Sequence, residues 1–492
     1  MELNYNELNI EKRAFIDGEY VSGIKRETMS RRNSYDGYDL SGITACGHED
    51  VEIAVRAARK SYETGVWKDM PLKKKKEVML NLADLIEENR KELAMLDTLE
   101  TCRAFQNYYE DSLPKAIETI RYSAECIDKY YDAAIPPQKG AYATINRIPL
   151  GVIAIITPWN DPMVVDAWKY VPALLMGNSV ILKPAEQSSL SLIKLADLTL
   201  KAGIPKGVFN VLPGYGEIVG KALGMHNDIN GIFFTGSSEV GKMIIQYSGM
   251  SNMKKVGLEC GGKSPFIVSR NCHDLKRAAK ILAKNIFYNQ GQICSAPSRV
   301  IVERVIVEEF VSYLKEECEE YVPGNPFEHR NKVGCIVSKE QYQKVKGYIE
   351  LAEFEGGVVY QAKNKKEKVE GACCIQPTII TGLSNNARSS QEEIFGPVVS
   401  VIEAENLKEA ISIGNDSRYG LAGAIFTDDL NEAYYGANHI EAGLVHINSW
   451  GEDENNTPFG GIKESGIGKD RSIYAFDEYS QLKTVWMTFQ GI

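Results

Sequence analysis

The first part of the chain repeats apolar side chains at helical spacing. Apolar positions recur every three or four residues over 51–64 and again over 71–101, where Pro71 opens the segment. This period places the apolar side chains on one face of a helix, and proline is favoured in a helix's first turn. We therefore predict helices over 51–64 and 71–101.

From residue 151 onward, short β-branched runs alternate with segments of helical period. The runs are 151–157, 179–183, 208–212 and 231–235, and the helical segments lie near 162–176, 188–202, 214–224 and 239–249. This alternation predicts an α/β fold with a doubly wound parallel sheet, which binds dinucleotides at the carboxyl ends of its strands.

Two further stretches extend this organisation. Alternation resumes over 265–445, which predicts a second α/β domain, as expected for a chain of 492 residues. The run 481–489 alternates like an exposed edge strand, which invites pairing with another subunit.

The composition narrows the classes of function. A formal charge of −10 argues against a nucleic-acid binder, which needs a basic face. Residues 1–13 are polar and lack the apolar core of a secretory signal. The longest apolar runs, such as Val152–Ile156, fall far short of the roughly 20 residues that span a bilayer. We therefore expect a cytoplasmic protein whose partners include neither nucleic acid nor membrane.

The cysteines and histidines show no metal-binding pattern. Ten cysteines lie without zinc-type CxxC pairs, and six histidines form no HExxH, HxH or CxxCH motif. We expect reduced, mostly buried thiols, with the adjacent Cys373 and Cys374 serving packing. We also expect no metal site, so that acid–base chemistry falls to Glu, Asp, Lys or Cys.

Three segments carry groups that suit nucleophilic catalysis. Cys294 lies in the polar segment 287–299, Glu259 precedes two glycines, and Asn160 follows the first strand of the predicted sheet. A thiol can be a nucleophile, a carboxylate a base, and an amide a donor to an oxyanion. Taken singly, each has an ordinary alternative: a structural cysteine, a surface charge or a turn residue.

Two segments suit a dinucleotide. Lys183 and Glu186 end the second strand, where they can bond ribose hydroxyls; a carboxylate there repels a 2′-phosphate and favours NAD over NADP. Gly236 and Ser237 form a tight turn before a helix whose N-terminus can receive a pyrophosphate. The spacing is GxxxxG, so it fails the usual GxGxxG fingerprint.

Together with EEIFGPV at 392–398 and PFGGIKESG at 458–466, these five segments resemble the aldehyde dehydrogenase superfamily. The resemblance runs in order from 15–20 to 483–487, nearly the whole chain, and is closest to the γ-glutamyl-γ-aminobutyraldehyde and aminoaldehyde or betaine-aldehyde branch. It implies an NAD-binding Rossmann-like domain (1–128 and 150–260), a catalytic α/β domain (261–470) and a small β oligomerisation element (129–149 and 474–492). It also implies a homodimer or homotetramer.

The resemblance also implies roles for individual residues. Cys294 would be the nucleophile and Glu259 the base that activates water, while Asn160 and the Cys294 backbone N–H would hold the oxyanion. The implied cofactor contacts for NAD, with NADP possible, are Lys183, Glu186, Gly236, Ser237, Trp159, Glu393 and Phe395. The implied substrate contacts are Trp168, Tyr288 and Phe459. The expected reaction oxidises an aldehyde to its acid through a thiohemiacetal and a thioester.

The substrate is less clearly indicated. Glu452, Asp453 and Glu454 lie in a row before PFGG, which favours a small cationic or amino-bearing aldehyde; the alternative is a solvated acidic loop. An ammonium could sit over Trp168 or Tyr288, but an apolar wall for aliphatic or aromatic aldehydes is equally allowed. Asp161 departs from the expected aromatic or apolar residue, and Cys102–Arg103 departs from the usual Gly–Lys.

Two other functions remain as alternatives. A CoA-acylating dehydrogenase would share the thiol but normally lacks the base, so Glu259 argues against it. A non-catalytic family member would not need the intact set of Cys294, Glu259 and Asn160.

Overall fold

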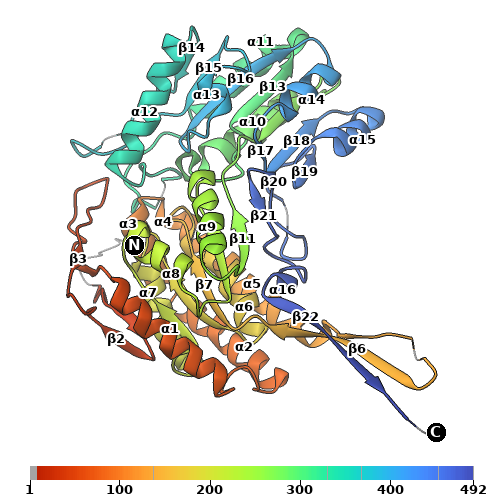
Figure 1. The fold of residues 1–492 in the computed structure, drawn as a ribbon. Coiled ribbons are helices and arrows are strands. Elements are labelled where there is room, and N and C mark those ends of the chain that lie inside the picture. The colour runs from red at the N-terminus through yellow and green to blue at the C-terminus, as the bar shows by residue number, and fades with distance from the viewer. Residues whose placement is uncertain (1–7, 137, 330, 367, 453, 491–492) are drawn as a thin grey trace.

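The computed structural model describes residues 8–136, 138–329, 331–366, 368–452 and 454–490. Two large sheets, each covered by helices, lie in separate halves of the molecule, and a slender ribbon of strands projects from one side (Figure 1). Within the described ranges, no helix combines the length and the apolar character that a bilayer crossing requires.

The first sheet has eight strands in the order β2-β1-β9-β8-β7-β10-β11-β21. Its strands are β1 (Ala14–Ile16), β2 (Glu19–Val21), β7 (Val152–Ile156), β8 (Ser179–Lys183), β9 (Phe209–Val211), β10 (Gly231–Thr235), β11 (Lys255–Glu259) and β21 (Gly466–Ile467). The five central strands, in the order β9-β8-β7-β10-β11, are all parallel to one another. The predicted doubly wound parallel sheet is therefore confirmed, with short antiparallel strands added at both edges.

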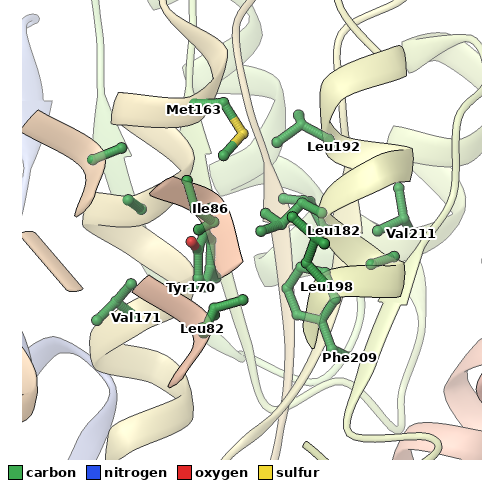
Figure 2. Close-up of a cluster of buried hydrophobic side chains, with 14 of the residues drawn as sticks. Leu82, Ile86, Met163, Tyr170, Val171, Leu182, Leu192, Leu198, Phe209 and Val211 are labelled. Carbon is green, nitrogen blue, oxygen red and sulfur yellow. The ribbon is translucent and has the colours of Figure 1, made fainter. Parts of the chain in front are cut away.

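Helices cover both faces of this sheet because its strands are apolar on both sides. They are α1 (His48–Glu63), α2 (Leu72–Glu88), α3 (Arg90–Thr101), α5 (Leu113–Cys126), α6 (Pro162–Leu175), α7 (Leu190–Ala202), α8 (Lys221–Met225) and α9 (Ser238–Met250). In β7, Ile153 and Ile155 join one core, while Val152 and Ile156 join the other. Figure 2 shows the first core, where Leu182 lies among side chains of α6 and α7.

The single helix predicted over 71–101 is wrong in one respect, because two helices occupy that segment. Asn89 separates α2 from α3, with ψ at 8°. Its side-chain amide donates to the Leu85 carbonyl at 2.7 Å. Asparagine competes in this way for backbone acceptors and favours helix ends.

The second sheet has seven strands in the order β14-β15-β16-β13-β12-β18-β19. They are β12 (Pro265–Val268), β13 (Arg299–Glu303), β14 (Val358–Gln361), β15 (Thr378–Thr381), β16 (Val398–Ala404), β18 (Ala422–Phe426) and β19 (Leu444–Ile447). Its helices include α10 (Leu275–Phe287), α11 (Val307–Cys318), α12 (Lys339–Phe354), α14 (Leu407–Asn415) and α15 (Leu430–His439). All neighbouring strands are parallel except β14 and β15. A second α/β unit is therefore present, as predicted.

The projecting ribbon is a three-stranded sheet in the order β22-β6-β5. β22 (Ser480–Thr488) pairs antiparallel with all of β6 (Ala141–Pro149), and β5 (Ala133–Ala134) lies on the other side of β6. The predicted C-terminal edge strand is therefore present, with β6 of its own chain on one side. Its other edge is unpaired in the described chain, and it carries Leu482 and Trp486 with 64% and 54% of their surfaces exposed.

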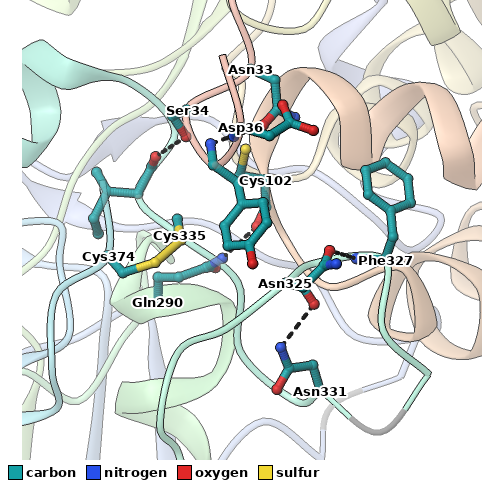
Figure 3. Close-up of a disulfide and its surroundings, with 12 residues drawn as sticks. Asn33, Ser34, Asp36, Cys102, Gln290, Asn325, Phe327, Asn331, Cys335 and Cys374 are labelled. Atoms are coloured by element: carbon teal, nitrogen blue, oxygen red, sulfur yellow. Dashed lines mark hydrogen bonds between the residues drawn. A yellow bond between two sulfur atoms is a disulfide. The ribbon is translucent and has the colours of Figure 1, made fainter. Parts of the chain in front are cut away.

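The expectation that every cysteine is reduced is wrong for one pair. A disulfide joins Cys335 to Cys374 (Figure 3). The two loops lie side by side because the Ile336 N–H donates to the Cys373 carbonyl at 2.9 Å. Cys373 itself is buried with a free thiol, in agreement with a packing role.

The core around β8 yields a test of stability. Leu182 is fully buried, so Leu182→Ala should destabilise the protein by about 2–5 kcal/mol through lost burial and a cavity. Leu430→Ala is the matched control, because Leu430 is 83% exposed, and it should change stability by less than about 0.5 kcal/mol. Thermal unfolding of the two variants measures the difference, and equal melting temperatures would contradict the assignment.

Candidate active site

A cavity of about 180 Å³ lies where the carboxyl ends of the first sheet face the loops of the second α/β unit. It collects segments that are far apart in the sequence. Its lining consists of Pro158, Trp159, Asn160, Thr235, Gly236, Ser237, Glu259, Cys260, Gly261, Cys294, Gln341, Lys344, Glu393 and Phe395.

The structure brings eight of the predicted site residues together in this cavity. They are Cys294, Glu259, Asn160, Trp159, Gly236, Ser237, Glu393 and Phe395. Lys183 and Glu186 lie outside the lining, at the end of β8. The three predicted substrate contacts, Trp168, Tyr288 and Phe459, are also outside it.

The segment before Cys294 has an unusual backbone. Asn289 and Gln290 have φ of 49° and 53°, the left-handed region that side chains other than glycine rarely adopt. Side-chain bonds hold them there: the Asn289 amide donates to the Asn160 carbonyl, and the Gln290 amide to the Cys102 carbonyl, both at 2.9 Å. Such strain persists where the surroundings over-determine it, typically at functional sites.

Gly291 is needed for the same turn. Its φ is 68°, and a Cβ there would lie 2.0 Å from the Gly396 carbonyl oxygen. Only glycine therefore allows the segment before Cys294 to pass this close to the loop that carries Phe395.

Cys294 holds a neutral thiol in the free protein at neutral pH. Burial, together with the nearby Glu393 and Glu259 carboxylates, raises the pKa of this thiol to about 12. A thiolate is the reactive species. A positive charge beside Sγ would therefore be required to form the nucleophile near pH 7.

Glu259 ends β11 and is 5% exposed. Burial raises the pKa of its carboxyl well above the usual value, and Asp470 raises it further, whereas Lys169 and Lys469 lower it. Asp470 in turn forms a buried ion pair with Lys169, at 2.7 Å between Oδ2 and Nζ. This environment favours the neutral acid and allows Glu259 to act as a base only once it is deprotonated.

Asn160 lies in the turn between β7 and α6, with 8% of its surface exposed. Its backbone carbonyl accepts a hydrogen bond from the Asn289 side chain, and the residue lines the cavity together with Cys294. The bond to Asn289 therefore fixes the amide relative to the loop of the thiol.

The N-terminus of α9 points into the same cavity. Ser237 caps this helix, because its Oγ accepts the Val240 N–H at 3.3 Å. Gly236 and Ser237 both line the cavity. Unpaired N–H groups and the helix dipole suit such a position to a phosphate group.

Lys183 and Glu186 form a polar pair at the end of β8. Their side chains are 3.5 Å apart, and Glu186 also accepts the Gly216 N–H. Burial lowers the pKa of the Lys183 ammonium, although Glu186 counteracts the shift. The pair can offer a donor and an acceptor to vicinal hydroxyls.

Glu393 and Phe395 line the cavity from a loop of the second α/β unit. Glu393 accepts the Gly262 N–H at 3.0 Å, and burial raises the pKa of its carboxyl to about 7. Phe395 has a φ of 57° and packs edge-on against Trp159, with ring centroids 5.2 Å apart.

The predicted substrate residues separate into two groups. The rings of Trp168 and Phe459 are 5.0 Å apart, and the Arg471 guanidinium lies over both, at 5.6 and 5.9 Å. Tyr288 instead contacts Arg103 and lies in a separate polar cluster. Of the acidic loop, Glu452 and Glu454 are described, whereas Asp453 lies outside the described residues.

Sequence reasoning missed several residues at or near the cavity. Gln341 and Lys344 line it from α12, although the segment reads as an ordinary surface helix. The Lys169–Asp470 pair joins positions that have no local signal. Arg103 and Asp161 did stand out, but only as departures from the family pattern.

Comparison with known proteins gives a consistent result. The protein-family model described as "Aldehyde dehydrogenase family" matches residues 20–485 of this chain. The NADP/NAD-dependent aldehyde dehydrogenase PuuC of Escherichia coli is 41% identical over 98% of this chain and 97% of its own length. The aminoacetaldehyde dehydrogenase of Pseudomonas aeruginosa is 39% identical, over 98% and 96%. The crystal structure of the aldehyde dehydrogenase KauB from Pseudomonas aeruginosa has a TM-score of 0.96, 42% identity and 98% coverage of both chains.

The raised pKa of Cys294 predicts how the thiol reacts in the free protein. Because the pKa is about 12, the thiolate fraction, and with it the rate of alkylation by iodoacetamide, should keep rising from pH 7 to beyond pH 10. Mass spectrometry of the Cys294 peptide measures the rate, and Cys294→Ala supplies the background from other thiols. A plateau near pH 8.5 would contradict the prediction.

Proposed function

The chain belongs to the aldehyde dehydrogenase family, and on this premise we propose that Cys294, Glu259 and Asn160 oxidise an aldehyde to its carboxylic acid with NAD(P)⁺. The observation that carries the proposal is the cavity itself. It places a thiol, a buried carboxyl and an amide beside the N-terminus of a helix.

The first step is attack of the Cys294 Sγ on the carbonyl carbon. The thiol gives its proton to water, a carbon–sulfur bond forms as the carbonyl π bond breaks, and the carbonyl oxygen becomes an oxyanion. The Asn160 amide and the Cys294 backbone N–H donate to this oxygen. One such donor contributes about 2.7–4 kcal/mol to the transition state.

The residues around the cavity fit a dinucleotide. Gly236 and Ser237 would hold the pyrophosphate at the start of α9, Lys183 and Glu186 the adenine ribose, and Glu393, with Phe395 and Trp159 beside it, the nicotinamide ribose. A bound oxidised nicotinamide would supply the hydride acceptor, and loss of hydride from the tetrahedral carbon would leave a thioester on Cys294. The positive charge of the nicotinamide would also lower the raised pKa of the Cys294 thiol and so favour the thiolate.

Glu259 then acts on water. The ionised carboxylate removes a proton from water, the oxygen attacks the thioester, and the carbon–sulfur bond breaks to release the acid and Cys294. Because burial raises the pKa of Glu259, this step becomes faster as the pH rises and the carboxylate forms.

An aldehyde that carries an amino group is the substrate class that we propose. The names of two relatives support it: γ-glutamyl-γ-aminobutyraldehyde dehydrogenase, whose structure from Burkholderia cenocepacia is 41% identical, and aminoacetaldehyde dehydrogenase. Glu452 and Glu454 add negative charge to the segment of the chain that leads to Phe459. Aliphatic or aromatic aldehydes are less favoured, and the presence of Glu259 disfavours a CoA-acylating enzyme.

The two large sheets and the projecting ribbon support a division of the chain into three functional parts. We propose a cofactor domain at 1–128 and 150–260, a catalytic domain at 261–470, and an assembly element at 129–149 and 474–492. β21 falls within 261–470 but pairs with β11. The proposed catalytic segment therefore contributes one strand, close to its own C-terminal end, to the first sheet. The unpaired edge of β22 supports a homodimer or homotetramer. We also propose a cytoplasmic location, which the eight free thiols among the described residues support.

The role of Glu259 is tested by separating the two half-reactions. Glu259→Gln should give a burst of about one NADH per active site and then a steady rate about 10²-fold or more below that of the wild type, because hydrolysis loses its base. Cys294→Ala should give neither burst nor turnover. Stopped-flow absorbance at the NADH band measures both, and normal turnover of Glu259→Gln would reject its role.

The role of Glu186 is tested by cofactor preference. Its carboxylate should repel a 2′-phosphate, so Glu186→Gln should raise kcat/KM for NADP⁺ relative to NAD⁺ by about tenfold or more. Glutamine keeps an oxygen acceptor for the Gly216 N–H. Glu217→Gln removes an exposed charge nearby and is the control. An unchanged ratio in Glu186→Gln would show that Glu186 does not face the ribose.

A further inference from the structure

The disulfide between Cys335 and Cys374 lies beside residues that position the nucleophile loop. Figure 3 shows it in one cluster with Cys102 and Gln290. The other eight cysteines are free thiols. In the cytoplasmic location proposed above, thiols are kept reduced, and a disulfide that does form there is usually redox-active. The pair is therefore a candidate for a reversible disulfide with a function.

The Cys102 carbonyl connects the disulfide to the nucleophile loop. It accepts the Cys335 N–H at 3.1 Å and the Gln290 side-chain amide at 2.9 Å. The two backbones approach closely, because a Cβ at Gly334 would lie 1.8 Å from this carbonyl oxygen. Only glycine therefore fits there. A movement of Cys335 would shift the carbonyl that stabilises the left-handed backbone of Gln290.

A second hydrogen bond joins the same segment, residues 334–338, to the nucleophile loop. The Val337 N–H donates to Gln292 Oε1 at 3.1 Å. Gln292 is 1% exposed and precedes Cys294 by two residues. A buried acceptor without a donor is unfavourable, so the position of Gln292 depends on that of Val337.

The segment also sets the start of α12. Ser338 caps this helix, because its Oγ accepts the Gln341 N–H at 3.2 Å. Gln341 lines the cavity, and its side-chain amide donates to the Phe395 carbonyl at 2.9 Å. The nucleophile loop and the loop of Phe395 therefore both depend on the short segment that the disulfide anchors.

Other contacts keep this segment folded when the sulfur–sulfur bond is absent. The Ser34 hydroxyl donates to the Ile336 carbonyl at 2.5 Å, and the Arg31 guanidinium donates to the Val337 carbonyl at 2.9 Å. Both donors come from the N-terminal part of the chain, not from the loop of Cys374. Reduction is therefore expected to shift the segment and to leave the protein folded.

One half of the disulfide can be reached by a reductant. Cys374 is partly exposed, whereas Cys335 is fully buried. A thiolate of a dithiol attacks Cys374 Sγ, the sulfur–sulfur bond breaks, and Cys335 leaves as a thiolate that takes a proton. The second thiol of the reductant then displaces Cys374, so the reductant becomes a disulfide and both cysteines become thiols. An oxidised dithiol reverses the exchange.

We propose that Cys335 and Cys374 form a reversible thiol–disulfide site that controls the nucleophile loop, with a dithiol as its reductant. The oxidised pair holds Gln290 and Gln292 in the arrangement described for the active site. The reduced pair lets the segment shift, which misplaces the loop of Cys294 and slows turnover. The inference rests on the proposed function, because it concerns the regulation of the same site.

The experiment equilibrates the whole protein in mixtures of reduced and oxidised dithiothreitol. Alkylation and mass spectrometry of the peptides that contain Cys335 and Cys374 measure the oxidised fraction. NADH production from 3-aminopropanal and from butanal, at saturating NAD⁺, measures kcat. The kcat of the wild type should fall about tenfold or more as the pair is reduced, because small displacements at an active site cost up to about 10²-fold in rate. Reoxidation should restore it.

Two variants separate this site from the other thiols. The double substitution Cys335→Ser with Cys374→Ser should keep the low kcat of the reduced protein in every mixture. Cys373→Ser is the matched control, because Cys373 is buried beside the pair but has a free thiol, and it should respond as the wild type does. Oxidation of Cys294 would lower the activity of all these proteins alike, so the ratio of wild type to double variant reports the pair alone.

Three results would overturn the proposal. The first is a constant ratio while mass spectrometry shows that the pair becomes reduced. The second is a pair that stays oxidised in the folded protein with excess dithiothreitol. The third is a loss of far-ultraviolet circular dichroism together with activity on reduction, which marks a purely structural disulfide. If the double variant does not fold, the kcat and the circular dichroism of the reduced wild type decide.

The regulation and the proposed function fail in different ways. If the oxidised wild type yields no NADH from either aldehyde, the proposed reaction is wrong and its regulation falls with it. If it yields NADH at a rate that does not depend on the state of the pair, only the regulatory role of Cys335 and Cys374 is wrong.

Discussion

The hydrogen bond from the Asn289 side chain to the Asn160 carbonyl joins the two halves of the active site. Asn160 belongs to a turn of the first sheet, and Asn289 to the loop that leads from the second unit to Cys294. Without this bond, the amide and the thiol would be positioned by separate bodies of the protein. The left-handed backbone at Asn289 and Gln290 is tolerated because these side-chain contacts stabilise it.

The site also contains several buried ionisable groups. Glu259, Glu393 and Cys294 all have raised pKa values because burial disfavours their ionised forms. At neutral pH the free protein therefore favours the neutral forms of Glu259 and of the Cys294 thiol in this cavity. Lys169 and Asp470 neutralise each other as an ion pair. They therefore influence the pKa of Glu259 without leaving an isolated buried charge.

The sequence was informative where local pattern decides structure. The strands of the first sheet follow from β-branched runs with intervening helical periods, and Cys294, Glu259 and Asn160 stand in motifs that occur in order. Lys344 and Asp470 reach the site only through tertiary packing, so no local pattern marks them. The break at Asn89 depends on one side-chain bond. The pairing of Cys335 with Cys374 depends on two loops that meet only in the folded chain.

The projecting ribbon has a consequence for how the chain folds. β6 is synthesised before either large sheet is complete, but its main partner, β22, follows the strands of both sheets in the chain. Until then, β6 exposes an unpaired edge, the kind of surface that pairs with other chains. Closure over such a sequence separation is slow because the intervening loop must first be ordered. Completion of this sheet thus requires that the strands of both large sheets have been synthesised, and assembly through the ribbon is confined to chains that already contain them.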